Sequence, residues 1–570
     1  MRKYLIIFIL ALAFFLRVIG IAKYPVGFTQ DEAGIGYDVY SILKTGKDQW
    51  GVTLPLTLRS FGDFKLPLYS YLAIPSVAVF GLNEFAVRFP NALFGTLAVL
   101  VTYLMVQELF KKSSFNARLV AILSALLLAI SPWHISLSRG AFEANLTTLL
   151  IPVGIWAYLL GSKKHWYVIL SALAFGLNLF SYYSARMVTP IIIISLLIYK
   201  NGTFKFSLNR ISSILKENKL FLGLFGIFVL GVIYSMFLGA NRRALDVGIF
   251  NPTDKWASVA NRRLEAIQNG LPEPLARLFS NKYTYVFSNF TRSYLSYFSP
   301  NFLFIQGAGE WNYGMIPGRG VLYTIEIVFL FLSLVAIINK KRFRYWQVMV
   351  IWILVSPIAA SISKSVGFAG NKVAVMIPAI QIFSALGLVV LMRMIKDYFK
   401  KDIIQKSLTY LIFIILIVSL VSFLEDYKYH TKLPAAPQMQ YGAQEWVTYV
   451  KGVEDKYGII YVSRSLGAPN IWIQFYEKWD PKEVQKASKE WLNYEKEGFL
   501  YLDRLDGYSL GKYRFGSLYY EKNKSIAGIL FVGKPEEFPE KIPTLHTVYY
   551  PDGKPAILIV DPSSQGFAAR

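Results

Sequence analysis

Long apolar runs separated by short polar stretches dominate the chain. A helix needs roughly 20 mainly apolar residues to cross the hydrocarbon core of a bilayer, and about eleven segments meet that requirement. The pattern therefore predicts a polytopic α-helical membrane protein. The expected spans are 4–22, 86–110, 117–134, 143–162, 166–182, 184–199, 220–239, 321–339, 346–363, 372–392 and 407–424.

Lysine and arginine are concentrated in alternate loops between these runs. With a cytoplasmic N-terminus, basic groups such as Lys111-Lys112, Lys163-Lys164 and Lys340-Lys341-Arg342 all fall in inner loops. The short outer loops contain only Arg139 and Lys364. The positive-inside rule then fixes the orientation in the plasma (inner) membrane. An odd number of spans places the chain after about residue 425 outside the cell.

Composition and charge agree with this interpretation. The chain has 570 residues, of which 54% are hydrophobic, too many for a typical water-soluble protein. A net charge of +24 would suit nucleic acid only if it lay on one polar face, whereas here it lies between apolar runs. We therefore expect no nucleic-acid partner. The absence of cysteine excludes disulfides and thiolate metal sites.

The start of the chain has the positive residues and apolar stretch of a signal peptide. Arg2 and Lys3 precede the apolar run Tyr4–Ala22. The run is long enough to span, and no convincing small-x-small cleavage site follows it. We expect a retained first helix.

Three polar stretches lie on the outer side: 23–85, 240–320 and 425–570. The expected domains are therefore a membrane domain, 1–424, and a soluble domain, 425–570. In the first stretch, Ile35, Val39 and Ile42 recur at helical spacing over too short a length to span, which predicts helices in the interface plane.

The second outer stretch is rich in aromatic residues. An aromatic belt at the headgroup level and a surface for sugars or lipid chains both need flat amphipathic rings, so both interpretations stay open. The rings belong to Tyr283, Tyr285, Phe287, Phe290, Tyr294, Tyr297, Phe298, Phe302 and Phe304.

The last stretch predicts a small α/β domain without a visible catalytic motif. Strands are expected at 458–463 and 527–533, a helix at 468–479, and a hairpin at 546–561 around Asp552-Gly553.

Asp31 and Glu32 follow the first apolar run by about nine residues and carry the strongest chemical signal. The structural alternative is specific. Thr29-Gln-Asp-Glu32 matches the Ser/Thr-x-x-Glu capping box, and acidic residues favour the first turn of a helix. Taken alone, the capping interpretation of the pair is the stronger one.

The surroundings of the pair favour chemistry. Lys65, Arg139, Arg186 and Glu143 are expected at a similar membrane depth, so the opposite charges predict a polar cavity. An acid acting as a base, beside cations that hold an anionic headgroup, is what group transfer from a lipid phosphate requires.

An ordered set of motifs resembles the GT-C superfamily of membrane glycosyltransferases, specifically its protein O-mannosyltransferase and lipid A aminoarabinose transferase group. The motifs cover most of residues 1–400. They are Asp31-Glu32, Lys65-Leu-Pro-Leu-Tyr-Ser-Tyr71, Phe80-Gly-Leu-Asn-Glu-Phe-Ala-Val-Arg-Phe-Pro90, Ser131-Pro-Trp-His-Ile-Ser-Leu-Ser-Arg139 with Glu143, Ser181-Tyr-Tyr-Ser-Ala-Arg186 and Gly320-Val-Leu-Tyr-Thr-Ile-Glu326.

The resemblance implies a hexosyl- or pentosyltransferase that inverts the sugar carbon. It would take the sugar from a polyprenyl-phosphate donor and pass it to a protein, lipid or glycan on the outer face. By the same resemblance, Asp31 would be the base, while Glu32 and Glu143 would position hydroxyls. Lys65 would meet the donor phosphate, with Arg88, Arg139 and Arg186 as lesser candidates for that contact.

No resident cofactor or metal is expected, although two acids remain compatible with a divalent ion. His134, at a helix end, is expected to be a packing or interfacial residue rather than a ligand. The chain also departs from the family pattern. Trp311-Asn-Tyr-Gly314 stands where many relatives have an Arg-His pair. The loop Val366-Gly-Phe-Ala-Gly-Asn371 lacks the basic residue that the resemblance implies near Asn371.

Two other functional classes compete with this hypothesis. A transporter or lipid flippase would place ionisable residues near the bilayer midplane, often on broken helices in two related halves, and the sequence shows neither feature. A membrane-anchored binding protein would leave the work to the soluble domain, for which about eleven helices are an excessive anchor.

Overall fold

The computed structural model describes residues 2–161, 163–199, 208–240, 248–249, 255–339, 345–363 and 367–563. Each of the predicted spans contains a helix, in most cases shorter than predicted. These helices are α1 (Arg2–Val18), α4 (Glu84–Phe110), α5 (Ala117–Ile130), α7 (Leu146–Leu160), α8 (His165–Asn178), α9 (Tyr183–Tyr199), α11 (Lys219–Ser235), α16 (Glu326–Ile338), α17 (Trp346–Val355), α19 (Ala379–Tyr398) and α20 (Asp402–Glu425).

Within the described ranges, 5 helices are long and apolar enough to cross a membrane, and up to 6 if α5 and the bent α6 (Pro132–Ser138) form one span. Shorter apolar helices of 10–17 residues accompany them. The expected count of about eleven crossings therefore stays a prediction. Lys340, Lys341 and Arg342, which support the predicted orientation, and the outer-loop Lys364 lie outside the described residues.

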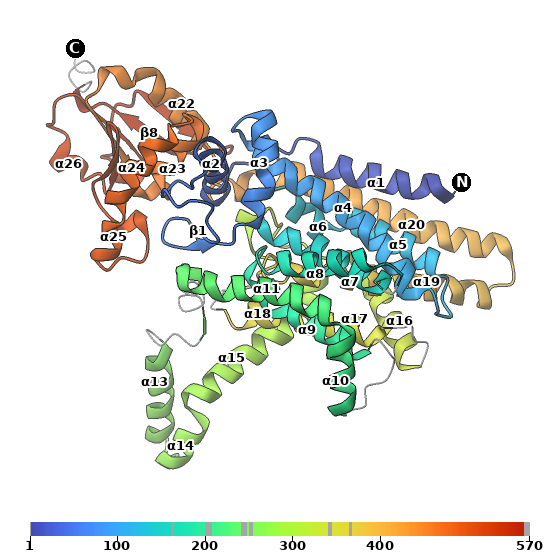
Figure 1. Ribbon diagram of the computed structural model, residues 1–570. Helices are drawn as coiled ribbons and strands as arrows, with labels where there is room; N and C mark the ends of the chain where they lie inside the picture. Colours follow the sequence, from blue (N-terminus) through green and yellow to red (C-terminus); the bar gives the residue numbers. More distant parts are fainter. Residues whose placement is uncertain are drawn as a thin grey trace.

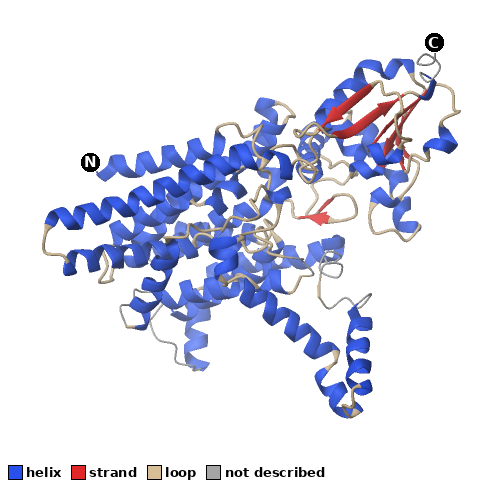
Figure 2. Ribbon diagram, turned by 180° about the vertical axis from the view of Figure 1, so that it is seen from behind, coloured by secondary structure: helices blue, strands red, loops and turns tan. Residues whose placement is uncertain are grey.

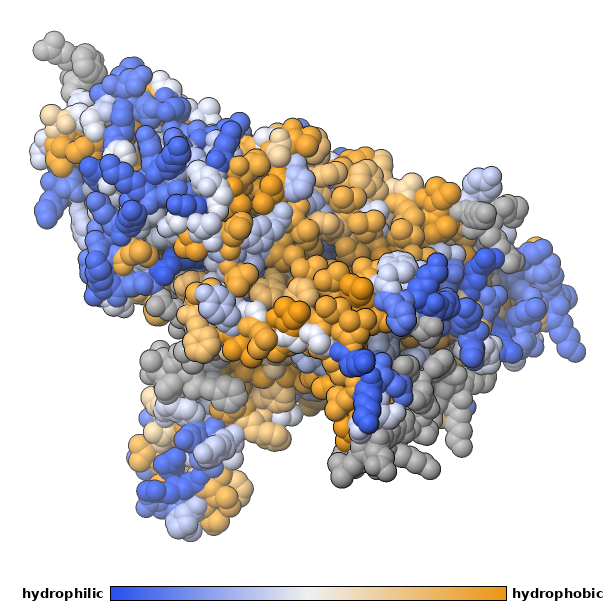
Figure 3. Space-filling view, viewed as in Figure 1, coloured by the Kyte–Doolittle hydropathy of each residue, from blue (hydrophilic) through white to orange (hydrophobic). Residues whose placement is uncertain are grey.

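The long helices form one elongated body. Helices α1, α4 and α20 run roughly parallel, and the strands gather beyond one end of them (Figures 1 and 2). Apolar side chains cover the middle of this body and polar ones its two ends (Figure 3). This distribution is the one that a bilayer requires of a spanning helical protein.

The first outer stretch forms α2 (Gln30–Thr45), a short hairpin of β1 (Leu58–Arg59) and β2 (Phe64–Lys65), and α3 (Leu68–Phe80). Helix α2 begins at a complete capping box and ends at Gly46, whose φ of 71° is left-handed. Most of α2 is buried against α3, α4, α23 (Pro469–Tyr476) and α24 (Pro481–Trp491). The apolar residues of α2 therefore pack against protein, and its place in the interface plane stays a prediction.

The second outer stretch extends away from the body as α13 (Lys255–Gln268), α14 (Glu273–Phe279) and α15 (Lys282–Ser296) (Figures 1 and 2). Its aromatic residues fall into two groups. Tyr283 and Phe287 are exposed and line an apolar cavity of about 700 Å³. Tyr297 and Phe302 are buried, and Phe302 packs against Trp133 with ring centroids 5.7 Å apart. Tyr297 and Phe302 therefore belong to the hydrophobic core.

The predicted soluble domain, whose described residues are 425–563, contains a 6-stranded sheet of order β4-β5-β3-β6-β8-β7. We call this part of the chain the soluble end. Its central strand β3 (Ile459–Ser463) pairs in parallel with β5 (Tyr513–Gly516) and β6 (Ile529–Gly533), whereas β4 (Tyr508–Leu510), β7 (His546–Tyr549) and β8 (Pro555–Val560) pair antiparallel to their neighbours. The expected strands and the hairpin are present, and α23 (Pro469–Tyr476) occupies the expected helix.

The remaining helices are short or peripheral. They are α10 (Leu208–Glu217), α18 (Ile358–Ser361), α21 (Lys432–Ala435), α22 (Ala443–Val453), α24 (Pro481–Trp491), α25 (Asn493–Lys496) and α26 (Tyr520–Asn523).

Candidate active site

Asp31 and Lys65 form an ion pair. Asp31 lies in the first turn of α2, Lys65 ends β2, and Lys65 Nζ is 2.8 Å from Asp31 Oδ1. The Lys65 side chain is only 9% exposed, while that of Asp31 is 42% exposed. The cation is therefore held in the protein, and the carboxylate remains open to a second molecule.

A small polar cavity of about 110 Å³ contains Asp31. It brings together three predicted site residues, Asp31, Glu32 and Glu143, from two separate parts of the chain. Its other walls come from the loop after α15 and from the segment after α21. The full lining is Thr29, Gln30, Asp31, Glu32, Ala141, Phe142, Glu143, Asn312, Tyr313, Gln438 and Gln440.

Glu32 and Arg88 are both fully buried and bind each other with two contacts. Arg88 Nε donates to Glu32 Oε1 at 2.8 Å, and Nη2 donates to Oε2 at 2.9 Å. Arg88 also donates to the carbonyls of Ile21, Pro25 and Gly27. This geometry gives Arg88 and Glu32 a structural task, because each charge already has its partner inside the protein.

Glu32 also fixes the loop that contains Glu143. The backbone N–H of Ala141 donates to Glu32 Oε1 at 3.0 Å, and Glu143 begins the short 3-10 helix Glu143–Asn145 two residues later. The capping interpretation of Glu32 is confirmed, since Thr29 and Glu32 cap each other as a capping box requires.

Arg139 and Arg186 differ in what their guanidinium groups bind. Arg139 is buried and donates to the carbonyls of Leu16, Ile19 and Tyr24, so it ties the end of α1 and the loop after it together. Arg186 is half-buried and donates to Leu179 O and Ser235 Oγ. His134 is buried between Arg17 and Thr148, which confirms its packing role.

Arg186 lies one side chain away from the strand that contains Lys65. The Tyr183 hydroxyl donates to Phe64 O at 2.7 Å, and the Arg186 guanidinium lies 5.4 Å from the centre of the Tyr183 ring. Of the three arginines, Arg186 is thus the one whose surroundings connect it to Lys65.

Sequence reasoning missed a buried acid, Glu310, that contacts the loop before α19. Glu310 Oε2 accepts the N–H of Asn371 at 2.9 Å, and Lys372 Nζ donates to Ser363 Oγ at 2.8 Å. Burial raises the pKa of Glu310 to about 7. Lys372 follows Asn371 directly, so the expectation that this loop lacks a basic residue is wrong, and the signal was visible in the sequence.

Two buried acids behind Lys65 were also missed. Asp38 and Asp48 are almost inaccessible. Burial, followed by repulsion from Asp48, raises the pKa of Asp38, and burial raises the pKa of Asp48 to about 6. Their spacing along the chain carries no signal, because only the fold of the loop after α2 brings them together.

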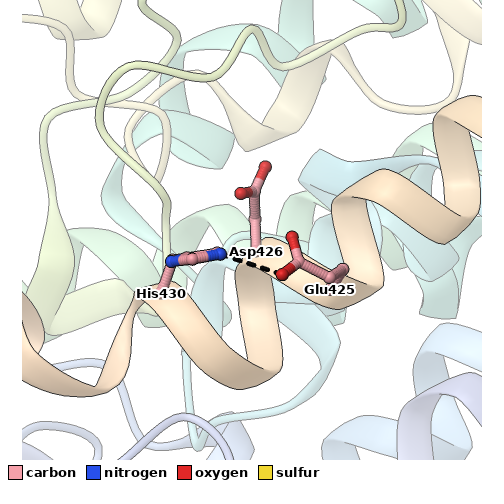
Figure 4. A group of neighbouring side chains, drawn as sticks. All are labelled: Glu425, Asp426 and His430. Atoms are coloured by element: carbon pink, nitrogen blue, oxygen red, sulfur yellow. Dashed lines mark hydrogen bonds and ion pairs between the residues drawn. The ribbon is translucent and has the colours of Figure 1, made fainter.

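Within the described part of the chain, one group of side chains has the spacing of a metal site. Oxygen and nitrogen atoms of Glu425, Asp426 and His430 lie within 4.8 Å of one another (Figure 4). A hydrogen bond joins His430 Nε2 and Glu425 Oε1 at 2.8 Å, while Asp426 forms an ion pair with Arg319. All three lie at the end of α20, and none lines the cavity of Asp31.

A protein-family model described as dolichyl-phosphate-mannose-protein mannosyltransferase matches residues 65–234. No curated protein matches the chain.

Among solved structures, ArnT from Cupriavidus metallidurans bound to undecaprenyl phosphate is similar over 97% of each chain, with 12% identity and a TM-score of 0.53. The oligosaccharyltransferase AglB from Archaeoglobus fulgidus, in complex with an inhibitory peptide and a dolichol-phosphate, has 14% identity and a TM-score of 0.49 over 83% of this chain. This chain spans 63% of the length of AglB. The family model and the fold shared with ArnT therefore confirm the resemblance to GT-C superfamily glycosyltransferases of the protein O-mannosyltransferase and lipid A aminoarabinose transferase type.

Proposed function

We propose that this protein is an inverting glycosyltransferase, which moves a hexose or pentose from a polyprenyl-phosphate donor to an acceptor hydroxyl on the outer face of the membrane. The observation that carries the proposal is the Asp31–Lys65 ion pair at a polar cavity, at the end of a body of apolar helices. The family model and the undecaprenyl phosphate bound to ArnT support the choice of donor.

The proposed reaction is a single displacement. The acceptor oxygen attacks the anomeric carbon from the side opposite the phosphate, a new C–O bond forms, and the bond from that carbon to the phosphate oxygen breaks. Asp31 accepts the hydroxyl proton, and polyprenyl phosphate leaves with the electron pair. Because phosphate is a good leaving group, alignment and charge neutralisation matter more than a strong base.

Lys65 would neutralise the departing phosphate. It now contacts Asp31, and a phosphate, which carries more negative charge than one carboxylate, can compete for the same ammonium group. Exchange of partners would place Lys65 on the donor and end its ion pair with Asp31, whose carboxylate would then accept the proton. Arg186 is our candidate for a second phosphate contact, because it is half-buried and adjoins the strand of Lys65.

The other predicted site residues divide by their contacts. Glu143, which lines the cavity with Asp31, would position hydroxyls of sugar or acceptor. The buried ion pair of Glu32 and Arg88 would hold the walls of the cavity in place. The contacts of Arg88 and Arg139 with backbone carbonyls would do the same. The membrane domain 1–424 and the soluble domain 425–570 would thus be a catalytic body with an appended α/β unit.

The Asp31→Asn substitution tests the proposal. Native mass spectrometry of the purified protein first identifies a co-purifying prenyl-phosphate sugar, which then serves as donor in proteoliposomes. We expect Asp31→Asn to lower kcat by about 10²- to 10⁴-fold, the usual contribution of a positioned base. The variant should still fold, because the Asp31 side chain is 42% exposed and asparagine has nearly the same shape, and unfolding in detergent checks this.

Two further variants make this test specific. Lys65→Met should raise the donor KM, since it removes the cation proposed to bind phosphate. Glu108→Gln removes a partly exposed carboxylate that pairs with Lys163 near the C-terminal end of α4, and it should retain full activity. Wild-type turnover by Asp31→Asn would refute the proposed function.

A further inference from the structure

Gln440 reaches from the soluble end of the molecule to the first turn of α2. The backbone N–H of Gln30 donates to Gln440 Oε1 at 2.6 Å, and Gln440 Nε2 donates to Gln30 Oε1 at 3.2 Å. The N–H of Ala468 also donates to Gln30 Oε1, at 3.1 Å. The residue that precedes Asp31 is therefore held through both its backbone and its side chain.

The contact of Gln440 with the backbone of Gln30 adds an acceptor to the N-terminal cap of α2. The first N–H groups of a helix have no partner within the helix. Thr29 accepts the N–H of Glu32, and Gln440 accepts that of Gln30, the first residue of the helix. A side chain 410 residues away thus orients the same turn from which Asp31 projects.

The backbone around Gln440 is built for this approach. Gln440 has a φ of 51°, a left-handed conformation that costs free energy in a residue other than glycine. A Cβ on Gly467 would lie 2.5 Å from both Gln30 Oε1 and Gln440 Nε2, and one on Gly27 would lie 2.3 Å from Met439 O. Glycine at these two positions lets the two parts of the molecule meet.

We propose that Gln440 is a positioning residue, by which the soluble end of the molecule sets the orientation of Asp31 and closes the cavity around it. Gln440 and Gln438 line the cavity of Asp31, so the soluble end supplies one of its walls. This inference rests on the proposed role of Asp31 as the base. It gives the soluble end a part in turnover beyond that of an appended unit.

Gln440→Gly is the sharpest variant for a test, because glycine removes the side chain but suits the left-handed backbone. We expect kcat to fall by about 10- to 100-fold, the scale of a misplaced catalytic group, with the donor KM within about threefold of wild type. Gln440→Ala should lose as much activity but unfold at a lower temperature than Gln440→Gly. Gln30→Ala, which keeps its backbone N–H, should lose less activity than either.

Arg59→Ala is the matched control. It removes an ion pair between Arg59 and Glu495 (2.8 Å), a contact that joins the same two parts of the molecule away from the cavity. We expect its kcat to match that of the wild type.

An unchanged kcat in Gln440→Gly would overturn the inference, as would an equal loss in Arg59→Ala, which would mean that both residues only dock the soluble end. Asp31→Asn, measured in the same assay, separates these outcomes from failure of the proposed function. If Asp31→Asn is inactive and Gln440→Gly is fully active, only the positioning role fails.

Discussion

Glu32 and Arg88 illustrate how a residue type that suggests chemistry can serve the frame of a site. Glu32 Oε1 accepts from Arg88 Nε and Ala141 N, and Oε2 accepts from Arg88 Nη2 and Thr29 N. A buried ion pair tolerates loss of solvent only when its remaining hydrogen-bonding positions are filled, as they are here. The pair joins α2, α4 and two loops in a single contact.

Arg88→Met should destabilise the protein strongly, because it leaves the buried Glu32 carboxylate without its counter-charge. We expect a loss of about 3–5 kcal/mol, the usual cost of breaking a buried pair, seen as a large fall in the unfolding temperature in detergent. Arg277→Met, which breaks an exposed pair with Glu273, should cost less than about 1 kcal/mol. Equal unfolding temperatures for the two variants would contradict a structural role for Arg88.

Glu310 should make stability depend on pH. Its pKa is raised from 4.5 to about 7, so the folded protein binds the proton more tightly than the unfolded chain does. The free energy of unfolding therefore falls as pH rises from 4.5 to about 7 and levels off above that value.

Glu310→Gln removes this proton equilibrium while keeping the shape of the protonated acid. Relative to wild type, its unfolding temperature should be similar near pH 5 and higher near pH 8, measured in the same detergent. Glu273→Gln, at an exposed site, provides the comparison. A temperature difference that does not change with pH would show that Glu310 does not titrate as its burial indicates.

At the scale of elements, the sequence predicts the helix ends and strands that depend only on residues adjacent in the chain. The capping box at Thr29 predicts where α2 begins, and alternating or continuous apolar residues predict β3, β6 and the β7–β8 hairpin. Strands β4 and β5 were not predicted, since they are only 3 and 4 residues long. Pro132 ends α5 and bends the chain by 59°, where the apolar pattern alone suggested a straight span.

The burial of α2 could not be predicted from its own residues. A Cβ on Gly36 would lie 2.6 Å from the Phe475 ring and 2.7 Å from Val87, so the helix fits between α4 and α23 only because glycine is there. Tyr37 Oη donates to Trp479 O at 2.8 Å on the same side. These partners are distant in sequence, and a local pattern carries no information about them.

The candidate site shows the same difference between what a local sequence pattern predicts and what only contacts between distant residues create. Motif resemblance selected Asp31, Lys65 and Glu143, which lie on different elements, and the fold brings Asp31 together with each of the others. It could not distinguish the arginines, because guanidinium groups that bind carbonyls and those that bind phosphate look alike in sequence. Gln440 was missed for the same reason as the partners of α2: its role exists only in the contact with Gln30.

For the whole molecule, the fold places the ion pair of Asp31 and the sheet of the soluble end at the same end of the helical body (Figure 1). An odd number of crossings would put that end outside.

A protease-sensitive tag after Arg570 should therefore be cleaved in intact spheroplasts, whereas a tag in the loop at Lys111-Lys112 should be cleaved only after lysis. Protection of the C-terminal tag would mean that the number of crossings is even.

The cap that Gln440 places on α2 has a consequence for biogenesis. During synthesis, Gln440 emerges from the ribosome 410 residues after Gln30. Until then, the backbone N–H of Gln30 lacks the acceptor that Gln440 supplies. Gly36 and Tyr37 likewise lack their contacts with Phe475 and Trp479. Contacts that are so distant in sequence form late in folding. Helix α2 would thus be among the last parts of the protein to reach its final position, after the soluble end has folded.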